Sequence, residues 1–378
     1  MMITDKLLSD AKFYGKLIGM LFDKEDLVSS KIKGTALERR LTLINVDPEE
    51  YPDYLIRLTR GLIPTLSVIT PNLDLVAIIE SSNVEYMITS LKDVVSEYSS
   101  GKINPVRIPE YAPEPMEASE ASIYEAINRV VDREPADFRV IELVESIAKG
   151  EKRYSSITKY INPLDQISLY YLGRGELKGN FAIYEAVKAI KGENSDIEDY
   201  ISEGRVFRSS RKENWGLLTD EAIVGYALLI RYLREGNDSD LNQAIKIKEF
   251  IKSNLETEKG FRDVVPKDPL TNIVYLEPLA NAEAAVFLSA LWQATEDEEA
   301  KGMTYKALGI AAVKSGYLAV SARIAHALLR LNHGIKTSVP GKYDDVRVMF
   351  NKKVECKFKQ GDKCSDNLEE FHGLGLEE

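Results

Sequence analysis

The chain has 378 residues, 44% apolar and 29% charged, a composition typical of folded, water-soluble domains. The formal net charge of −11 comes without any basic stretch, which argues against nucleic-acid binding. No apolar run approaches the ~18–20 residues of a membrane span, and the charged N-terminal stretch lacks a signal-peptide pattern. We therefore expect a cytoplasmic protein. Its length favours two domains, because single cores stop growing near ~250–300 residues.

Apolar runs alternate with amphipathic stretches over the first hundred residues. The expected order is α-β-α-β-α-β-β-α, so residues 1–100 are interpreted as an α/β domain. The turn between the last two strands is the proline-containing Pro71-Asn72-Leu73-Asp74. We expect helices at 1–15, 23–40, 48–60 and 84–98, and strands at 16–22, 41–47, 65–70 and 75–80.

Residues 101–120 are rich in proline and show no periodicity, which predicts a linker or a strap lying over a surface.

From about residue 121 to residue 340 the pattern is helical, and it repeats. IYEAINRVV at 123–131 recurs as IYEAVKAIK at 183–191. YLREGNDSDLNQAIKIKEF at 232–250 recurs loosely as ALWQATEDEEAKGMTYKAL at 290–308. Because an apolar helix, an acidic turn and a second helix recur, we expect tandem helical hairpins in a stacked or circular array of roughly ten helices.

The last segment, 341–378, is interpreted as a tail with a β-hairpin of 346–350 and 354–358. Two cysteines, Cys356 and Cys364, lie in this tail. Two ordinary thiols are the favoured interpretation, with a local disulfide as an alternative. A zinc site using His372 is a third alternative, although a fourth ligand is missing. We therefore expect no metal site.

Blocks in both regions, taken in order, resemble the family of thioredoxin domain-containing proteins related to spermatogenesis-associated thioredoxin-like proteins. Members join a thioredoxin-like domain to an (α/α) six-hairpin toroid. The blocks are INVDPEEYPD (44–53), IPTLSVITPNLDLVA (63–77), GRVFRSSRKENW (204–215), LLTDEA (217–222) and PLANAEAAVFLSAL (278–291). The resemblance implies this fold for the chain, as a reduced member of the family.

One departure from the family decides the chemistry of the first domain. Family members carry a Cys-His-x-Cys-His motif after the first strand, where this chain reads FDKEDLVSSK at 22–31. Because thiol–disulfide exchange needs a thiolate at the site, we predict a non-redox domain. Pro64 falls where thioredoxins place a cis proline, and a trans proline at the start of an edge strand is the alternative.

Candidate catalytic residues lie in the helical region, because toroids of this type bind sugars at one end. Asp220 matches the family aspartate and starts a helix, and a glutamate such as Glu277 or Glu283 would complete an acid–base pair. Alternatively, Asp220 is a helix-terminal acid favoured by the macrodipole. The ligand-binding candidates are Arg208, Trp215, Tyr226 and Asn281. For Arg208 we favour an ion pair with a local acid, and for the two aromatics we favour core packing.

His326 is expected to be a core histidine. Epimerase chemistry is disfavoured because His326 and His333 are about 10 Å apart along one helix. No nucleotide-binding, zinc-protease or serine-hydrolase motif is present, and no cofactor is expected. Two hypotheses remain open. The first is a non-redox binding or scaffolding protein with a site for a sugar or another small molecule, and its protein partner is unknown. The second is a glycosidase-like carbohydrate-active enzyme.

Overall fold

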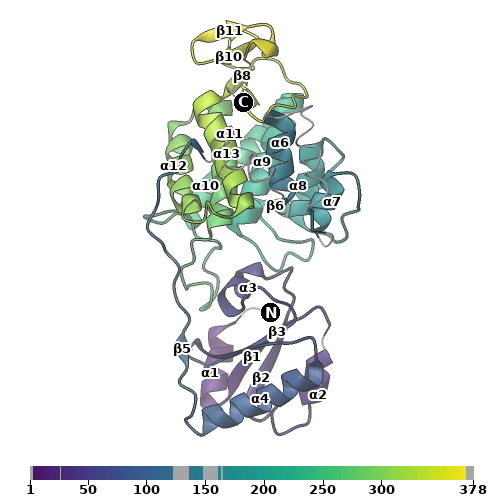
Figure 1. Ribbon diagram of the computed structural model, residues 1–378, viewed down its shortest axis with the longest axis vertical. Coiled ribbons are helices and arrows are strands. Elements are labelled where there is room, and N and C mark those ends of the chain that lie inside the picture. The colour runs from purple at the N-terminus through teal and green to yellow at the C-terminus, as the bar shows by residue number, and fades with distance from the viewer. Residues whose placement is uncertain (1–2, 26, 122–135, 148–160, 163–164, 372–378) are drawn as a thin grey trace. The chain divides into compact units, whose positions relative to one another are not determined.

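The structure is a computed structural model that describes residues 3–25, 27–121, 136–147, 161–162 and 165–371 (Figure 1). The chain forms two compact units. The sheet unit comprises Met1–Tyr111 together with Val264–Tyr275, and the helical unit comprises Ala112–Asp263 and Leu276–Glu378. This confirms an α/β region followed by a helical region. It also differs from the sequence-based boundaries, because twelve residues from the later region, 264–275, belong to the sheet unit.

The sheet unit is built on five strands in the order β2-β1-β3-β4-β5. β1 runs parallel to β2 and antiparallel to β3, and β4 lies between β3 and β5 and is antiparallel to both. The Ile63–Pro64 peptide bond just before β3 is cis. The strands are β1 (Leu17–Phe22), β2 (Leu41–Val46), β3 (Thr65–Ile69), β4 (Asp74–Glu80) and β5 (Val106–Arg107). β5 lies in the segment predicted as a linker or strap.

Helices cover both faces of this sheet. The order of helices and strands matches the expected one, with α1 (Asp5–Phe13), α2 (Leu27–Ile32), α3 (Pro52–Leu58) and α4 (Val84–Ser99). The helix predicted at 23–40 is wrong in length, because 33–40 form turns and Gly34 adopts φ 79°, a left-handed conformation that ends a helix.

Alternation along the strands divides the core between the two faces. Ile18, Met20 and Phe22 of β1 point to the cluster that includes α1 and α3. Leu17 and Leu21 point to the opposite cluster, which includes residues of α2 and α4. Because both faces are buried, β1 is apolar at every position rather than at alternate ones.

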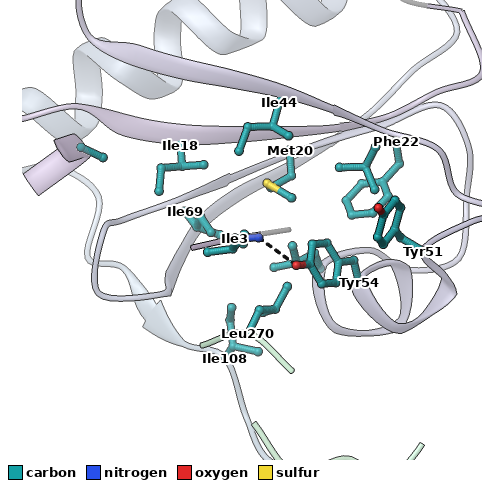
Figure 2. Packing of buried hydrophobic residues seen from close by; sticks show 13 residues of the cluster. Ile3, Ile18, Met20, Phe22, Ile44, Tyr51, Tyr54, Ile69, Ile108 and Leu270 are labelled. Atoms are coloured by element: carbon teal, nitrogen blue, oxygen red, sulfur yellow. Dashed lines mark hydrogen bonds between the residues drawn. The ribbon is translucent and has the colours of Figure 1, made fainter. Parts of the chain in front are cut away.

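Segment 264–275 completes the first of these clusters. Leu270 is fully buried among Ile3, Ile108 and the β1 side chains (Figure 2). The hydroxyl of Tyr54 donates to Asp268 and accepts from the backbone N–H of Ile3 at 2.9 Å. The core of the sheet unit therefore depends on residues that follow it by more than 150 positions in the chain.

The helical unit contains eight α-helices within the described residues. They are α6 (Phe138–Ile147), α7 (Gln166–Tyr171), α8 (Ala182–Lys191), α9 (Leu218–Glu235), α10 (Asp238–Asn254), α11 (Pro278–Thr295), α12 (Glu298–Ala312) and α13 (Leu318–His333). Neighbouring contacts run from α6 to α7, α8, α9, α11 and α13 and return to α6, which makes a closed circuit. α10 packs on α9, and α12 packs on α11.

The second pair of repeated segments forms two equivalent helical hairpins. α9 ends at left-handed Gly236 and α10 begins after the N-cap Asn237. α11 ends at left-handed Glu296 and α12 begins after the N-cap Asp297. The predicted helix–acidic turn–helix pattern is confirmed for both hairpins. Of the first repeated pair, 183–191 lies within α8, whereas 123–131 lies outside the described residues.

The tail forms a four-stranded sheet in the order β11-β10-β8-β9. β8 (Ile335–Thr337) separates β9 (Val348–Phe350) from β10 (Phe358–Gln360), so the predicted hairpin of 346–350 with 354–358 is wrong. Asn351 explains the difference. Its side chain is buried and donates to Gln293 O at 3.0 Å, and its backbone N–H donates to Thr337 O at 2.9 Å. These hydrogen bonds hold residue 351 against α11 and β8, so the chain does not form a hairpin turn at this position.

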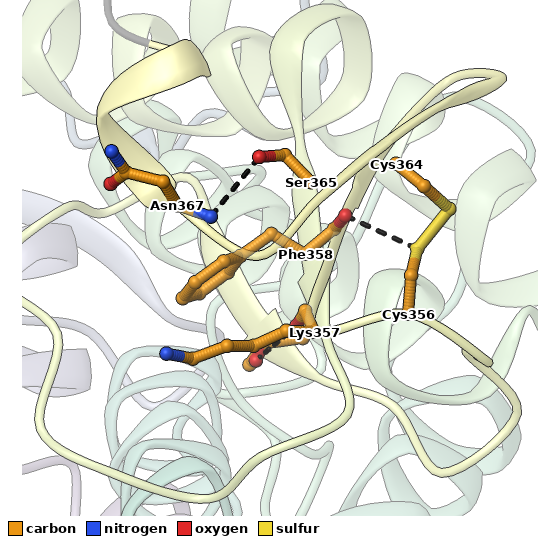
Figure 3. The surroundings of a disulfide bond; sticks show 7 residues. Cys356, Lys357, Phe358, Cys364, Ser365 and Asn367 are labelled. Carbon is orange, nitrogen blue, oxygen red and sulfur yellow. Dashed lines mark hydrogen bonds between the residues drawn. A yellow bond between two sulfur atoms is a disulfide. The ribbon is translucent and has the colours of Figure 1, made fainter.

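The hairpin of this tail is formed by β10 and β11 (Lys363–Ser365). Cys356 and Cys364 are joined by a disulfide across it (Figure 3). The favoured interpretation of two ordinary thiols is therefore wrong. The Cα atoms of Cys356, two residues before β10, and Cys364 in β11 lie 5.9 Å apart, within the range that a disulfide spans.

Candidate functional site

Ionisable side chains gather inside the closed circuit of helices. Arg323 and Glu283 are almost completely buried, with side chains 1% and 2% exposed, and both are the sixth residue of their helices. We call the whole set the axial cluster. It consists of Arg139 and Glu142 on α6, Tyr226 on α9, Glu283 on α11, and Arg323, His326 and Arg330 on α13.

A single chain of polar contacts connects most of the axial cluster. Arg323 lies at its centre, with Nη1 2.5 Å from Glu142 Oε2 and Nε 2.9 Å from Glu283 Oε2. Glu283 also accepts from Arg139, which in turn binds Asp137 at 2.6 Å. Positive and negative groups therefore alternate through the interior, and each glutamate is neutralised by at least one arginine.

The network of polar contacts continues from Glu142 to Arg330 through a tyrosine. The Tyr226 hydroxyl donates to Glu142 Oε1 at 3.0 Å and accepts from Arg330 Nη2 at 3.3 Å. The Arg330 guanidinium also lies over the Tyr226 ring, 5.2 Å from its centroid. Burial and the Glu142 charge raise the pKa of Tyr226 above its usual range, so the hydroxyl keeps its proton and remains a donor.

Burial and the charges fix the protonation of the other groups. Burial alone would lower the pKa of Arg323, but the charges of Glu283 and Glu142 raise it above the usual value. Burial, together with Arg330 and Arg323, holds the pKa of His326 well below 6.5. His326 is therefore neutral at physiological pH. It is a core histidine, as expected, with Nδ1 3.4 Å from Arg323 Nη1.

Asp220 is not a member of the axial cluster. It is buried in the first turn of α9, and its Oδ1 is 2.5 Å from Arg208 Nη1. This is the local ion pair favoured for Arg208. An arginine at this distance stabilises the ionised carboxylate, which suits a structural acid or an anionic base rather than a proton donor.

Glu277 and Asn281 hold the start of α11. Glu277 is the N-cap and accepts from the backbone N–H of Ala280. Burial raises its pKa, against the lowering effect of the backbone N–H groups. The Asn281 side chain accepts from Phe261 N at 3.0 Å and donates to Phe261 O at 2.9 Å. Asn281 is thus fully committed to the backbone of the preceding loop.

The structure brings the predicted site residues together in separate groups: Asp220 with Arg208, Glu277 with Asn281, and Glu283 with Tyr226 in the axial cluster. Trp215 lies apart from the axial cluster. Its ring packs edge-on against Phe250, with ring centroids 6.4 Å apart, and the guanidinium of Arg205 lies over it. The sequence analysis missed Glu142, Arg323 and Arg330. Charged residues inside the apolar stretches of α6 and α13 were the signal that could have found them.

No group of three or more His, Cys, Asp and Glu side chains in the described ranges has a metal-binding arrangement. His372 lies outside those ranges. Both cysteines of the chain are consumed by the disulfide. Among the helices that the structure describes, none combines the length and the apolar composition needed to cross a bilayer.

Comparison of the chain with protein-family models and with curated proteins finds no match.

Proposed function

We propose that this is a non-redox binding protein in which the helical unit holds a small molecule at the axial cluster and the sheet unit has a structural or scaffolding role. The observation that carries the proposal is the buried chain of charged groups from Arg139 to Arg330. Burying charges costs several kcal/mol each, and replacing them with apolar groups is often neutral or stabilising. Such a cluster suits ligand recognition better than packing.

A thioredoxin-like fold for the sheet unit is part of this proposal. The order β2-β1-β3-β4, with only β3 antiparallel to the rest and helices on both faces, is the pattern that the family resemblance implies. The turn after β1 contains no cysteine, and both cysteines of the chain are bonded to each other. Without a thiolate the unit has no disulfide-exchange chemistry.

A six-hairpin type of toroid for the helical unit is proposed on similar grounds. The closed circuit of contacts through α6, α9, α11 and α13, and the repeated hairpins α9–α10 and α11–α12, both support it. In such an array the inner helices face one another, so polar groups on them converge on the axis. The converging side chains are those of the axial cluster.

The enzyme alternative, a glycosidase-like activity, has one observation in its favour. Asp220 and Glu277 occupy the first turn of α9 and the N-cap of α11, two neighbouring helices. Burial raises the pKa of Glu277, as expected of a general acid, whereas Asp220 is paired with Arg208 as an anion. Unequal environments of two carboxyls are typical of acid–base pairs. Glu277 is nevertheless occupied as a helix cap, so we rank this function second.

Both functions can be tested with the purified protein. We expect no hydrolysis of a panel of aryl glycosides and no reduction of insulin disulfides, together with thermal stabilisation by some of the mono- and oligosaccharides in a screen. Turnover of an aryl glycoside that Glu277→Gln abolishes would replace our proposal by the enzyme. Glu213→Gln is the matched control, because that glutamate is exposed and lies outside the candidate acid–base pair.

A further inference from the structure

Arg330, at one end of the axial cluster, uses only part of its hydrogen-bonding capacity. Arg330 is 1% exposed and has no carboxylate within ion-pair distance among the residues that the structure describes. Its polar contact is with the Tyr226 hydroxyl, and in the described part of the chain Nε and Nη1 have no acceptor. A buried guanidinium without an anionic partner is costly.

Two further side chains of α13 also have unused hydrogen-bonding atoms. Arg323 Nη2 and His326 Nε2 are buried and have no hydrogen-bond partner among the residues that the structure describes. Residues 323, 326 and 330 are spaced i, i+3 and i+7 along α13, so the three side chains share one helix face. The Tyr226 ring joins them, since it stacks edge-on against His326 at 5.6 Å and beneath Arg330 at 5.2 Å.

The opposite end of the cluster is already saturated. Glu283 binds both Arg323 and Arg139, and Arg139 is paired with Asp137, whose side chain is 21% exposed. Arg330, by contrast, reaches the nearest carboxylate of the network, Glu142, only through the Tyr226 hydroxyl. Neutral His326 adds a ring nitrogen that can donate, depending on its tautomer.

We propose that Arg330, Arg323 and His326 form a binding site for a small oxyanion, either a carboxylate or a phosphate group of the ligand. This rests on the proposed binding function and names the ligand's chemical class. The planar guanidinium of Arg330 can bind two oxygens of such a group side by side. Arg323 Nη2 and His326 Nε2 supply further donors.

The test compares melting temperatures in sodium phosphate, sodium acetate and sodium chloride at equal ionic strength and at pH 7, after prolonged equilibration because the groups are buried. We expect the melting temperature to rise saturably with the concentration of phosphate, of acetate or of both, relative to chloride. The phosphate and acetate measurements distinguish a phosphate-bearing from a carboxylate-bearing ligand. Phosphate also stabilises proteins generally by exclusion from their surface, so the comparison of variants decides.

Arg330→Met should weaken the apparent anion affinity at least tenfold and should melt at or above the wild-type temperature in chloride, since it removes an uncompensated charge. Arg330→Lys should show a smaller anion-dependent rise in melting temperature, because lysine keeps the positive charge but lacks the planar guanidinium that binds two oxygens. Arg60→Met, at an exposed arginine, should respond like the wild type.

Identical melting of the wild type in the three salts would overturn the site, as would an unchanged response in Arg330→Met. A lower melting temperature of Arg330→Met in chloride would assign Arg330 to the fold instead. None of these outcomes depends on neutral sugars or on glycoside turnover, so the binding function and the oxyanion site can fail separately.

Discussion

Arg323 is the residue whose loss should affect the helical unit most. Its guanidinium neutralises both Glu142 and Glu283, which are nearly as buried as Arg323 itself. Arg323→Met would leave these carboxylates with fewer counter-charges, and breaking a buried ion pair costs about 3–5 kcal/mol. We expect a loss of this size in urea-unfolding experiments.

The matched control for this prediction is a surface lysine. Lys352 pairs with Asp238 at 2.6 Å, but both side chains are more than half exposed. Lys352→Met should therefore cost only about 0–1 kcal/mol. Equal losses in the two variants would mean that the interior network contributes no more than a surface pair.

His326 should make the protein sensitive to mild acid. Its folded-state pKa lies well below 6.5, so below pH 6.5 the unfolded chain takes up a proton that the folded chain does not. Stability must then fall as the pH falls below 6.5, with a slope that approaches about 1.4 kcal/mol per pH unit for one proton. His326→Gln should lose this contribution. Urea midpoints at pH 7 and 5.5 measure it, and parallel pH profiles for variant and wild type would contradict it.

Individual residues of the site were only partly predictable. Glu283 could be selected because it lies in a sequence block, 278–291, that resembles a known family, and Tyr226 because it is an aromatic residue in the helix that follows Asp220. Glu142 and Arg323 could be noticed as charges in apolar helical stretches, but their pairing could not be predicted, because it joins positions 181 residues apart and nothing local in the sequence specifies which of 60 acidic residues meets which base. The structural roles of Asp220 and Glu277 depend likewise on a nearby arginine and on backbone N–H groups.

At the scale of the elements, two glycines should respond to alanine with opposite signs. Gly236 ends α9 with φ 69°, and an added Cβ would lie 2.9 Å from Pro340 Cγ. Gly236→Ala should cost about 1–2 kcal/mol, the penalty for a left-handed L-residue, or more if Pro340 cannot move.

Gly302 is exposed in the middle of α12, with no atom within 4 Å of an added Cβ. Gly302→Ala should stabilise by about 0.5–1 kcal/mol, because alanine loses less backbone entropy in a helix. Thermal or urea unfolding of both variants measures the pair. A loss of stability in both variants would show that the left-handed conformation of Gly236 does not distinguish the two positions.

Elements with strong local signals were the predictable ones. The strands around Ile18 and Val68 are apolar and bounded by turn residues, and the α9–α10 and α11–α12 hairpins repeat in the sequence. The tail was not predictable. Its sheet inserts β8 between β9 and β10, a non-local pairing fixed by buried Asn351, whose sequence neighbours read as an ordinary hairpin turn.

At the scale of the molecule, a mutation in the later part of the sequence should destabilise the first unit. Leu270 is fully buried in the core of the sheet unit, so Leu270→Ala should cost about 2–5 kcal/mol. Hydrogen exchange should accelerate in β1 and β2 while α11 remains protected. Leu62→Ala, at a position that is 61% exposed, should leave exchange unchanged. Faster exchange confined to the helical unit would contradict the assignment of segment 264–275.

The same segment has a consequence for the order in which the protein can fold during synthesis. Domains usually fold as units, the N-terminal one first, as the chain leaves the ribosome. Here the first 111 residues emerge without Leu270 and Asp268, which complete their core. The nascent sheet unit must therefore remain incomplete, with part of its apolar face uncovered, until all of α6 to α10 and segment 264–275 have been translated.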